Sequence, residues 1–312
     1  MKDNFREQRL AQKDLKRGRV LAVLPTEVLV GYEKEKIYCT LRGVLKKRES
    51  RDKNLIIVGD FVLFEGNTIE EICDRFSLLS RQEHLTRRKQ QLIAANIDQV
   101  LITVSVNEPH LKPSLIDRYL IATYKGDMEP VIVINKVDIT TNQEELKEIT
   151  KLYEALGIPV IHTSVVTGEG LDQLKEQMRN VASVFSGQSG VGKSSLINAM
   201  TGLDLTVGEV VAKTNKGSHT TSSASLIPLD CGGFCIDTPG IRSFGVWDIK
   251  REDLVAHFSE ITEVAGGCHF PNCTHTHEPK CAVREAVERG ELSLIRFESY
   301  LRLLTETVSP SF

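Results

Sequence analysis

The sequence predicts an α/β protein in three parts: a small β-barrel, a parallel sheet with crossover helices, and a helical segment with clustered cysteines. Residues 1–75 hold short strands separated by glycine and charged turns. Residues 94–247 alternate apolar strands with helical stretches, which is typical of a parallel sheet. Residues 248–312 combine helical stretches with three closely spaced cysteines. We expect residues 76–93 to be a linker.

The first part contains five short strand patterns. Such a set favours a small Greek-key barrel of the oligonucleotide-binding (OB) type, with an SH3-like barrel as the competing assignment. The expected strands are Gly18–Leu24, Glu27–Tyr32, Lys36–Leu41, Ile56–Phe64 and Thr68–Cys73.

The second part follows a strand–helix alternation whose strands are nearly continuous apolar runs, as in parallel sheets buried on both faces. The expected strands are Gln99–Val104, Val131–Ile134, Val160–His162, Val181–Phe185 and Gly233–Ile236. The expected helices are Leu115–Tyr124, Gln143–Leu156, Leu171–Asn180 and Ser195–Met200. In the third part we expect helical structure over Leu254–Val264 and Ala282–Leu304.

A glycine-rich loop of the pattern G-x-x-x-x-G-K-[ST] lies between an expected strand and an expected helix, the context that a phosphate-binding loop requires. Its glycines let backbone N–H groups converge on phosphate oxygens, and the helix N-terminus adds partial positive charge. We expect Lys193 to bridge to the β- and γ-phosphates and Ser194 to hold Mg²⁺. The residues assigned to nucleotide binding here are Gly187, Gln188, Ser189, Gly190, Val191, Gly192, Lys193, Ser194 and Ser195.

A second motif, Asn-Lys-x-Asp, follows the strand Val131–Ile134 and so lies at its carboxyl end, where open α/β sheets bind ligands. Asp138 can accept hydrogen bonds from guanine N1–H and the exocyclic amino group, which adenine cannot supply, and this separates GTP from ATP. We expect Asn135 to bond the base edge and loop backbone, and the Lys136 stem to cover the base. Ser164, in the loop after the next strand, is expected to help close the guanine pocket.

A third motif, Asp-Thr-Pro-Gly, follows the strand Gly233–Ile236. Asp237 is expected to face a Mg²⁺-bound water, and the Gly240 amide to reach the γ-phosphate and report its loss. A polar, glycine-containing segment before this strand is typical of a mobile switch loop. Either Thr220 or Thr221 in that segment is expected to supply the second protein oxygen to Mg²⁺, and the sequence does not choose between them.

Ile241 follows this motif, where many GTPases carry the glutamine that orients the attacking water. Intrinsic hydrolysis is therefore expected to be slow unless another group or a partner orients the water. His219 is the nearest candidate in the sequence, because imidazole accepts or donates a proton near neutral pH. The alternative is a loop histidine with no catalytic role.

The motifs occur in an unusual order. The base-reading tetrad comes first, the phosphate loop second and the Asp-Thr-Pro-Gly turn last. Ordinary small GTPases begin with the phosphate loop. The middle part is therefore predicted to be a circularly permuted α/β P-loop GTPase domain, with the barrel before it and the cysteine-containing helical domain after it.

The C-terminal cysteines form the set Cys268-x4-Cys273-x-His275-x5-Cys281. Clustered cysteines in a reducing compartment more often bind metal than pair as disulfides. Four N/S ligands close a tetrahedral site, so we expect one structural Zn²⁺ in a helical zinc domain. His269 and His277 are the reserve ligands, which leaves the choice of histidine open.

The charge is uneven along the chain. Residues 1–92 carry 20 Lys and Arg against 14 Asp and Glu, while residues 93–312 carry 19 against 28. The basic first part favours a phosphate-facing surface, as RNA binding requires. The sequence has no apolar run long enough to span a membrane, and its N-terminus is too charged for a secretory signal, so a cytoplasmic location is expected.

Five features occur together in this sequence. They are the expected barrel, the permuted motif order, the run Gly-Gln-Ser-Gly-Val-Gly-Lys-Ser-Ser-Leu-Ile-Asn, the Asp-Thr-Pro-Gly-Ile-Arg turn and the Cys/Cys/His/Cys set. In this combination the chain resembles the ribosome small-subunit-dependent GTPase A family over essentially its whole length. The resemblance implies GTP, Mg²⁺ and zinc as cofactors, and a catalytic candidate at the switch-loop histidine, which is His219 here.

The same resemblance implies that the small ribosomal subunit and its rRNA are the partners. Members of this family act in late assembly of that subunit: they bind rRNA in the GTP state, and the subunit stimulates hydrolysis before release. A monomer is expected. An ATP-using P-loop enzyme and an RNA-binding module whose nucleotide only stabilises it are the alternatives.

The permutation suggests a mechanism. The γ-phosphate-sensing turn runs within a short stretch into the zinc domain, whereas the base-reading half connects back to the barrel. We therefore expect loss of the γ-phosphate to shift these two arms relative to each other.

Overall fold

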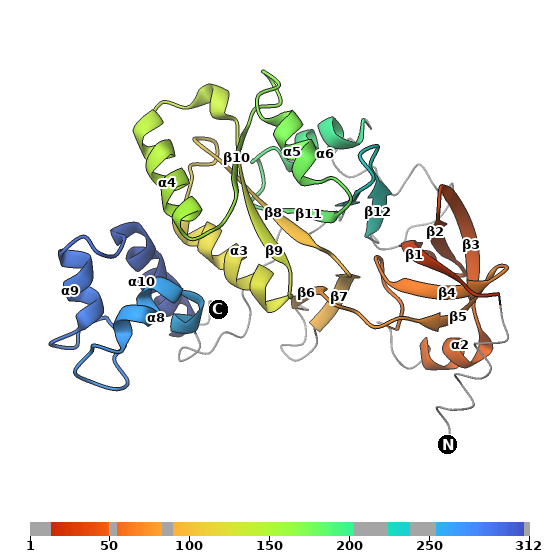
Figure 1. Cartoon of the computed structure of the whole chain (residues 1–312), viewed down its shortest axis with the longest axis horizontal. Helices are drawn as coiled ribbons and strands as arrows, with labels where there is room; N and C mark the ends of the chain where they lie inside the picture. Colours follow the sequence, from red (N-terminus) through yellow and green to blue (C-terminus); the bar gives the residue numbers. More distant parts are fainter. Residues whose placement is uncertain (1–13, 50–54, 83–89, 203–223, 238–253, 309–312) are drawn as a thin grey trace.

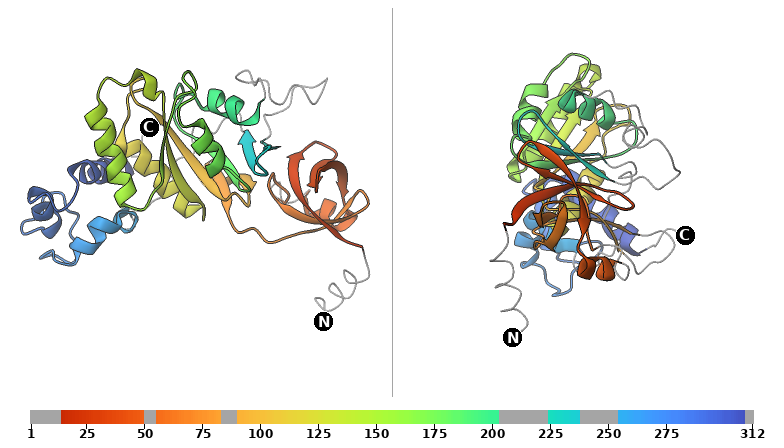
Figure 2. Two further views of the ribbon diagram at one scale, coloured as in Figure 1. Left: turned by 45° about the horizontal axis from the view of Figure 1, so that its top comes forward. Right: turned by 90° about the vertical axis from the view of Figure 1, so that its right-hand side faces the viewer.

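The computed structural model describes residues 14–49, 55–82, 90–202, 224–237 and 254–308 (Figure 1). The barrel and the C-terminal helices lie at opposite ends of a central sheet domain (Figures 1 and 2). Among the described residues, none of the helices is both long and apolar enough to cross a membrane.

The barrel has the strand order β1-β2-β3-β5-β4, and pairing of β1 with β4 closes it. Strands β3 and β5 are parallel, and a helix not expected from the sequence, α2, separates β3 from β4. This closed five-stranded order is that of an OB-type barrel, which decides against the SH3-like alternative. The elements are β1 (Lys16–Val23), β2 (Val28–Tyr32), β3 (Glu35–Leu41), α2 (Gly43–Glu49), β4 (Phe61–Glu65) and β5 (Thr68–Ile72).

The fourth barrel strand starts later than expected, at Phe61 instead of Ile56. The preceding residues form a turn, because the Asp60 carboxylate accepts from the Ile57 amide at 2.8 Å and Gly59 has a φ of +88°. The buried Asp60 carboxylate also accepts from the Arg75 guanidinium at 2.6 Å. The apolar residues before Phe61 therefore pack as a buried turn.

Where the sequence was read as a linker, the structure has an antiparallel hairpin of β6 (Leu78–Gln82) and β7 (Gln90–Ala95). Its buried residues Leu79 and Ala94 pack into the core of the sheet domain.

The central domain has five parallel strands in the order β10-β9-β8-β11-β13, followed by antiparallel β12. Strand β8, the first of this domain's strands along the chain, lies between β9 and β11. The strands are β8 (Gln99–Ser105), β9 (Glu129–Asn135), β10 (Val160–Thr163), β11 (Ala182–Ser186), β12 (Ser225–Pro228) and β13 (Phe234–Asp237). The helices are α3 (Pro113–Lys125), η1 (Val137–Ile139), α4 (Gln143–Ala155), α5 (Leu171–Gln177) and α6 (Lys193–Thr201).

Helices cover both faces of this sheet. Along β8, Ile102 lies in the core formed with α3 and α4, and Leu101 in the core formed with α5 and α6. Because successive strand residues point to opposite faces, a strand buried on both sides is mainly apolar. All seven residues of β8 are buried, and its polar residues Gln99, Thr103 and Ser105 each form a hydrogen bond.

The C-terminal domain consists of η3 (Val255–His257), α8 (Ser259–Ala265), α9 (Ala282–Glu288) and α10 (Leu294–Val308). The expected helical stretch Ala282–Leu304 is two helices, because Gly290 adopts a φ of +72° between them and both the Glu291 and Leu292 amides donate to Ala286 O. The stretch Leu254–Val264 is likewise broken at Phe258. Ile121 of α3 packs into the core of this domain.

Candidate functional site

Three of the sequence motifs meet at one edge of the sheet. Asn135 ends β9, Thr163 ends β10 and Ser186 ends β11, and these strands belong to one parallel set. The carboxyl ends of parallel strands lie together, so the base-reading loop, the loop that begins at Ser164 and the phosphate loop lie at the same edge of the sheet.

The phosphate loop has the backbone that its glycines permit. Gly190 and Gly192 adopt φ values of +86° and +94°, which residues with a Cβ rarely adopt. A Cβ at Gly187 would lie 2.0 Å from Thr103 O, and one at Gly192 would lie 2.3 Å from Asn135 Nδ2. The loop therefore packs directly on β8 and on the base-reading motif.

Helix α6 begins at Lys193 with no side-chain cap on its first amides, which suits an anion at its N-terminus. Ser194 is half-buried and Ser195 exposed in the first turn. The Lys193 ammonium donates to Gly187 O at 2.7 Å and to Gln188 O at 2.6 Å, so it lies across the loop to which phosphates would bind.

Asn135 connects all three motifs. Its Nδ2 donates to Val191 O of the phosphate loop at 2.8 Å, and its Oδ1 accepts from Thr163 Oγ1 at 3.1 Å. The side chain is 2% exposed. A buried amide with both ends satisfied fixes the positions of its partners, because each unpaired group would cost about 1–3 kcal/mol.

The rest of the base-reading loop is supported by the segment between β8 and α3. Lys136, with a left-handed φ of +63°, donates through Nζ to Glu108 O at 2.6 Å. Asn107 Nδ2 donates to Ile139 O at 2.6 Å. Asp138 is exposed beside these contacts, free to face a ligand. The motif gave no signal for this support, because the partners lie 28 and 32 residues away in the chain.

Ser164 is buried, and its polar groups form hydrogen bonds within its own loop. Its amide donates to Glu169 O at 3.0 Å, and its hydroxyl accepts from the Thr167 amide at 3.2 Å. The next residue, Val165, is half-buried and Val166 is exposed.

Asp237 is the last residue of β13, which lies next to the phosphate-loop strand β11 with Ile236 opposite Val184. The remaining expected catalytic residues, His219, Thr220, Thr221 and Gly240, lie outside the described residues.

In the C-terminal domain, Cys268, Cys273, His275 and Cys281 converge, with their ligand atoms within 4.8 Å of one another. Cys268 Sγ lies 3.9 Å from Cys281 Sγ, and His275 Nδ1 lies 3.6 and 3.5 Å from these two sulfurs. A tetrahedral Zn²⁺ with Zn–S of about 2.3 Å and Zn–N of about 2.0 Å requires S···S of about 3.8 Å and S···N of about 3.5 Å. The four side chains therefore fit zinc.

The structure also chooses between the histidines. His275 is 3% exposed, whereas His277 is exposed and its Nδ1 lies 2.8 Å from Thr276 Oγ1. Burial, together with the neighbouring thiols of Cys281 and Cys268, raises the pKa of the Cys273 thiol above its usual range.

Glu278, which the motif did not single out, organises the loop around His275. Its carboxylate accepts from the Thr274 amide at 2.8 Å, the Thr274 hydroxyl at 2.6 Å and the Thr276 amide at 3.1 Å. Burial acts to raise the pKa of Glu278, but the hydrogen bonds from Thr274 outweigh it and hold that pKa below its usual range. Tyr300 OH of α10 donates to Thr274 O at 3.1 Å, which attaches this loop to the helices.

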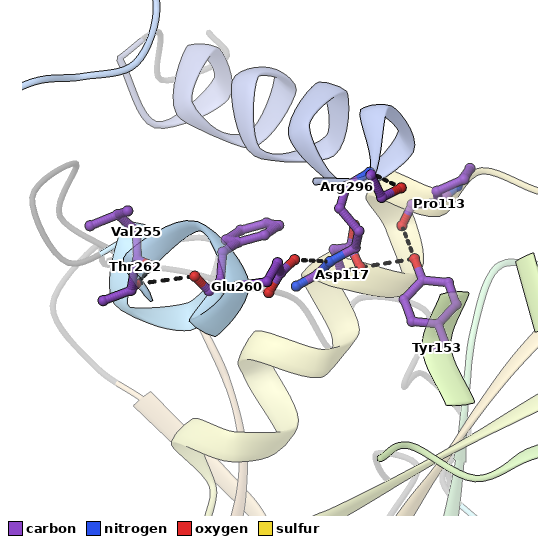
Figure 3. Close-up of polar contacts among 9 residues, drawn as sticks. Pro113, Asp117, Tyr153, Val255, Glu260, Thr262 and Arg296 are labelled. Atoms are coloured by element: carbon purple, nitrogen blue, oxygen red, sulfur yellow. Dashed lines mark hydrogen bonds and ion pairs between the residues drawn. The ribbon is translucent and has the colours of Figure 1, made fainter. Parts of the chain in front are cut away.

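A buried ionic network attaches the C-terminal helices to the sheet domain (Figure 3). Arg296 of α10 donates to Asp117 of α3 and, at 2.6 Å, to Glu260 of α8. Tyr153 of α4 also donates to Asp117, at 2.9 Å. Burial acts to lower the pKa of Arg296, but the negative charges of Asp117 and Glu260 outweigh it and raise that pKa, so the guanidinium stays charged.

The comparisons with known proteins agree with this geometry. The model of the RsgA GTPase family matches residues 72–247. The small ribosomal subunit biogenesis GTPase RsgA of Thermotoga neapolitana is 38% identical over 301 residues, 93% of this chain and 96% of that protein. The protein of the same name from Gemmatimonas aurantiaca is 40% identical over 285 residues, 89% of this chain and 92% of that protein.

Solved structures match over nearly the whole chain. YjeQ from Thermotoga maritima superposes with a TM-score of 0.75 and 33% identity, covering 95% of this chain and all of that one. YloQ, described as a circularly permuted GTPase, superposes with a TM-score of 0.72 and 30% identity, covering 96% and 97%. The predicted permuted fold and the predicted family are thereby confirmed. The chain belongs to the RsgA GTPase family and is a GTP-hydrolysing enzyme.

Proposed function

We propose that GTP binds at the carboxyl edge of the parallel sheet, with Asn135, Lys136 and Asp138 at the guanine and residues 187–195 at the phosphates. The observation that carries this proposal is the hydrogen bonding of Asn135 to both Val191 O and Thr163 Oγ1. Because one buried side chain fixes the base-reading loop against the phosphate loop, the two ends of a nucleotide meet groups that are already positioned. Ser164 supports the guanine pocket through the fold of its loop.

Mg²⁺ would be held with the nucleotide by Ser194, in the first turn of α6, and by Asp237 through water, at the end of β13. These residues suit a hard cation because they offer oxygen ligands beside the phosphate loop. When bound, the ion neutralises charge on the β- and γ-phosphates. Three further roles are predictions from the sequence. Thr220 or Thr221 would be the second oxygen ligand, Gly240 would sense the γ-phosphate, and His219 would orient the attacking water.

The protein is proposed to assist late assembly of the small ribosomal subunit, hydrolysing GTP to GDP and phosphate with stimulation by the subunit and release afterwards. Two relatives named for biogenesis of this subunit support the assignment. The OB-type barrel and the excess of basic residues in the first 92 residues suit contact with rRNA. The protein is proposed to act as a cytoplasmic monomer.

Cys268, Cys273, His275 and Cys281 are proposed to hold one structural Zn²⁺, because four N/S ligands leave no open position for catalysis. We propose the division into a barrel (1–75), a connecting segment (76–93) that holds β6 and the start of β7, a GTPase domain (94–247) and a zinc domain (248–312).

The test is nucleotide hydrolysis with GTP and with ATP, each with and without purified small ribosomal subunits. Slow GTP turnover that rises many-fold only with subunits is expected. Equal use of ATP would refute guanine reading, and the absence of stimulation by subunits would refute the partner.

A further inference from the structure

The barrel strand β1 is linked to β13, the strand that ends in Asp237, through β12, which pairs with both. Ala22 of β1 is opposite Ser225 of β12, and Ser225 is opposite Asp237 of β13. Ala22, Ser225 and Asp237 therefore form one row across three neighbouring strands, and the position of β1 bears on the end of β13.

Arg19 of the same barrel strand contacts the start of β13. Its guanidinium carbon lies 5.0 Å from the ring centroid of Phe61 in the barrel and 5.0 Å from that of Phe234, the first residue of β13. The guanidinium also donates to Asn96 O, just before β8. Its Nε is buried without a hydrogen-bond partner among the described residues.

Strand β13 pairs with β11 on one side and with β12 on the other. It and β12 each have four residues, and β12 lies between β13 and β1 in the sheet. A short strand needs neighbours on both sides to fix its position, and β12 has β1 of the barrel as its second neighbour. The barrel is the neighbour on the outer side (Figure 2).

We propose that Arg19 is a positioning residue for GTP hydrolysis: by packing on Phe234, it lets the barrel hold β13 so that Asp237 lies at the correct distance from the γ-phosphate side of the site. This inference rests on the proposed role of Asp237 at the Mg²⁺-bound water. Among the described residues, it names the OB-type barrel as an arm that reaches, through β12, the strand ending in Asp237.

The test uses the full chain without ribosomal subunits. The variants are Arg19→Met, which removes the planar cation, and Arg19→Lys, which keeps the charge. Arg17→Met is the matched control, because Arg17 also packs on Phe61, at 4.4 Å, but is exposed. The measurements are kcat and KM for GTP, and the affinities for GDP and for a non-hydrolysable GTP analogue.

Arg19→Met is expected to lower kcat about 10-fold, since a small displacement caused from a distance is enough to do so. It should also weaken binding of the GTP analogue more than binding of GDP. Arg19→Lys should recover part of the loss, and Arg17→Met should behave as the unchanged protein. The proposal would be overturned if Arg19→Met and Arg17→Met had the same kcat and nucleotide affinities. It would also be overturned if Arg19→Met weakened binding of GDP and of the GTP analogue equally.

Asp237→Asn, measured in parallel, separates this inference from the proposed function. If Asp237→Asn hydrolyses GTP normally, the proposed role of Asp237 is wrong. If Asp237→Asn is inactive while Arg19→Met is normal, only the positioning role is wrong. Phe234→Leu tests the same contact from β13. It should weaken binding of the GTP analogue and leave GDP binding unchanged. If Phe234→Leu binds both nucleotides normally, the inference fails, and this result holds even if Arg19→Met misfolds.

Discussion

Arg296 of α10 forms a buried ion pair with Asp117 of α3, and this pair joins the C-terminal helices to the half of the GTPase domain that reads the base. Helix α3 follows the segment that supports Lys136 and Ile139 through Glu108 O and Asn107. The C-terminal domain is therefore packed against α3, the helix that follows the segment supporting the Asn-Lys-x-Asp loop.

Removing one partner of this buried ion pair should destabilise the folded protein. Arg296→Met leaves the Asp117 carboxylate buried, 1% exposed, without its cation, and should lower the free energy of unfolding by about 3–5 kcal/mol. Asp117→Leu combined with Arg296→Met should lose less, because the fully buried carboxylate is removed together with its cation and only the less buried Glu260 loses a partner. Denaturant unfolding measures both. Arg289→Met, which breaks an exposed pair with Glu291, should change nothing measurable, and an equal loss there would contradict the argument.

Gly192 should not tolerate a methyl group. In Gly192→Ala the new Cβ would meet Asn135 Nδ2 at 2.3 Å and push apart the base-reading and phosphate loops, so GTP and GDP affinity should fall about 100-fold. Gly202→Ala at the other end of α6 is the control, because Gly202 also has a positive φ, +65°, but nothing lies near its Cβ position. Nucleotide binding titrations distinguish the two, and similar losses would show that backbone strain alone explains the effect.

Asp138 should determine the choice of base. Asp138→Asn replaces one carboxylate oxygen with an amide donor, so it leaves guanine N–H groups unpaired and should weaken GTP binding about 100-fold. The same variant should bind xanthosine triphosphate better, because xanthine carries a carbonyl in place of the exocyclic amine. Competition binding with GTP, ATP and xanthosine triphosphate tests this. Asp127→Asn, also exposed and at a positive φ of +56°, should keep the preference for GTP.

One zinc ion per chain should be found by elemental analysis. His275→Ala and Cys281→Ser should lose it and expose the C-terminal core to proteolysis, because the metal replaces a large apolar core in this loop. His277→Ala should keep the metal, since His277 lies outside the cluster and contacts Thr276. Zinc retention in His275→Ala would contradict the ligand assignment.

The fold was largely predictable where periodicity is strong. The strands of the parallel sheet are buried on both faces and therefore read as apolar runs, and each expected strand there is present within two residues at either end. Prediction was wrong where a local turn interrupted an apolar stretch, as at Gly59 before β4 and Gly290 between α9 and α10. The hairpin of β6 and β7 was missed because its stabilising partners are distant in the chain.

The sequence by itself predicted the permuted family, because the phosphate loop, the Asn-Lys-x-Asp tetrad, their permuted order and the clustered cysteines are local patterns of residue type and spacing. The grouping of His275 with the cysteines came from the structure. Only the tertiary structure decided where the barrel and the zinc domain each pack on the GTPase domain. Chain connectivity pointed from the Asp237 turn to the zinc domain, yet the barrel pairs with the strands leading to Asp237, and the zinc domain packs on α3. The reason is physical. Pairing of Ala22 with Ser225 and of Arg296 with Asp117 depends on burial and charge between distant segments, which no local pattern records.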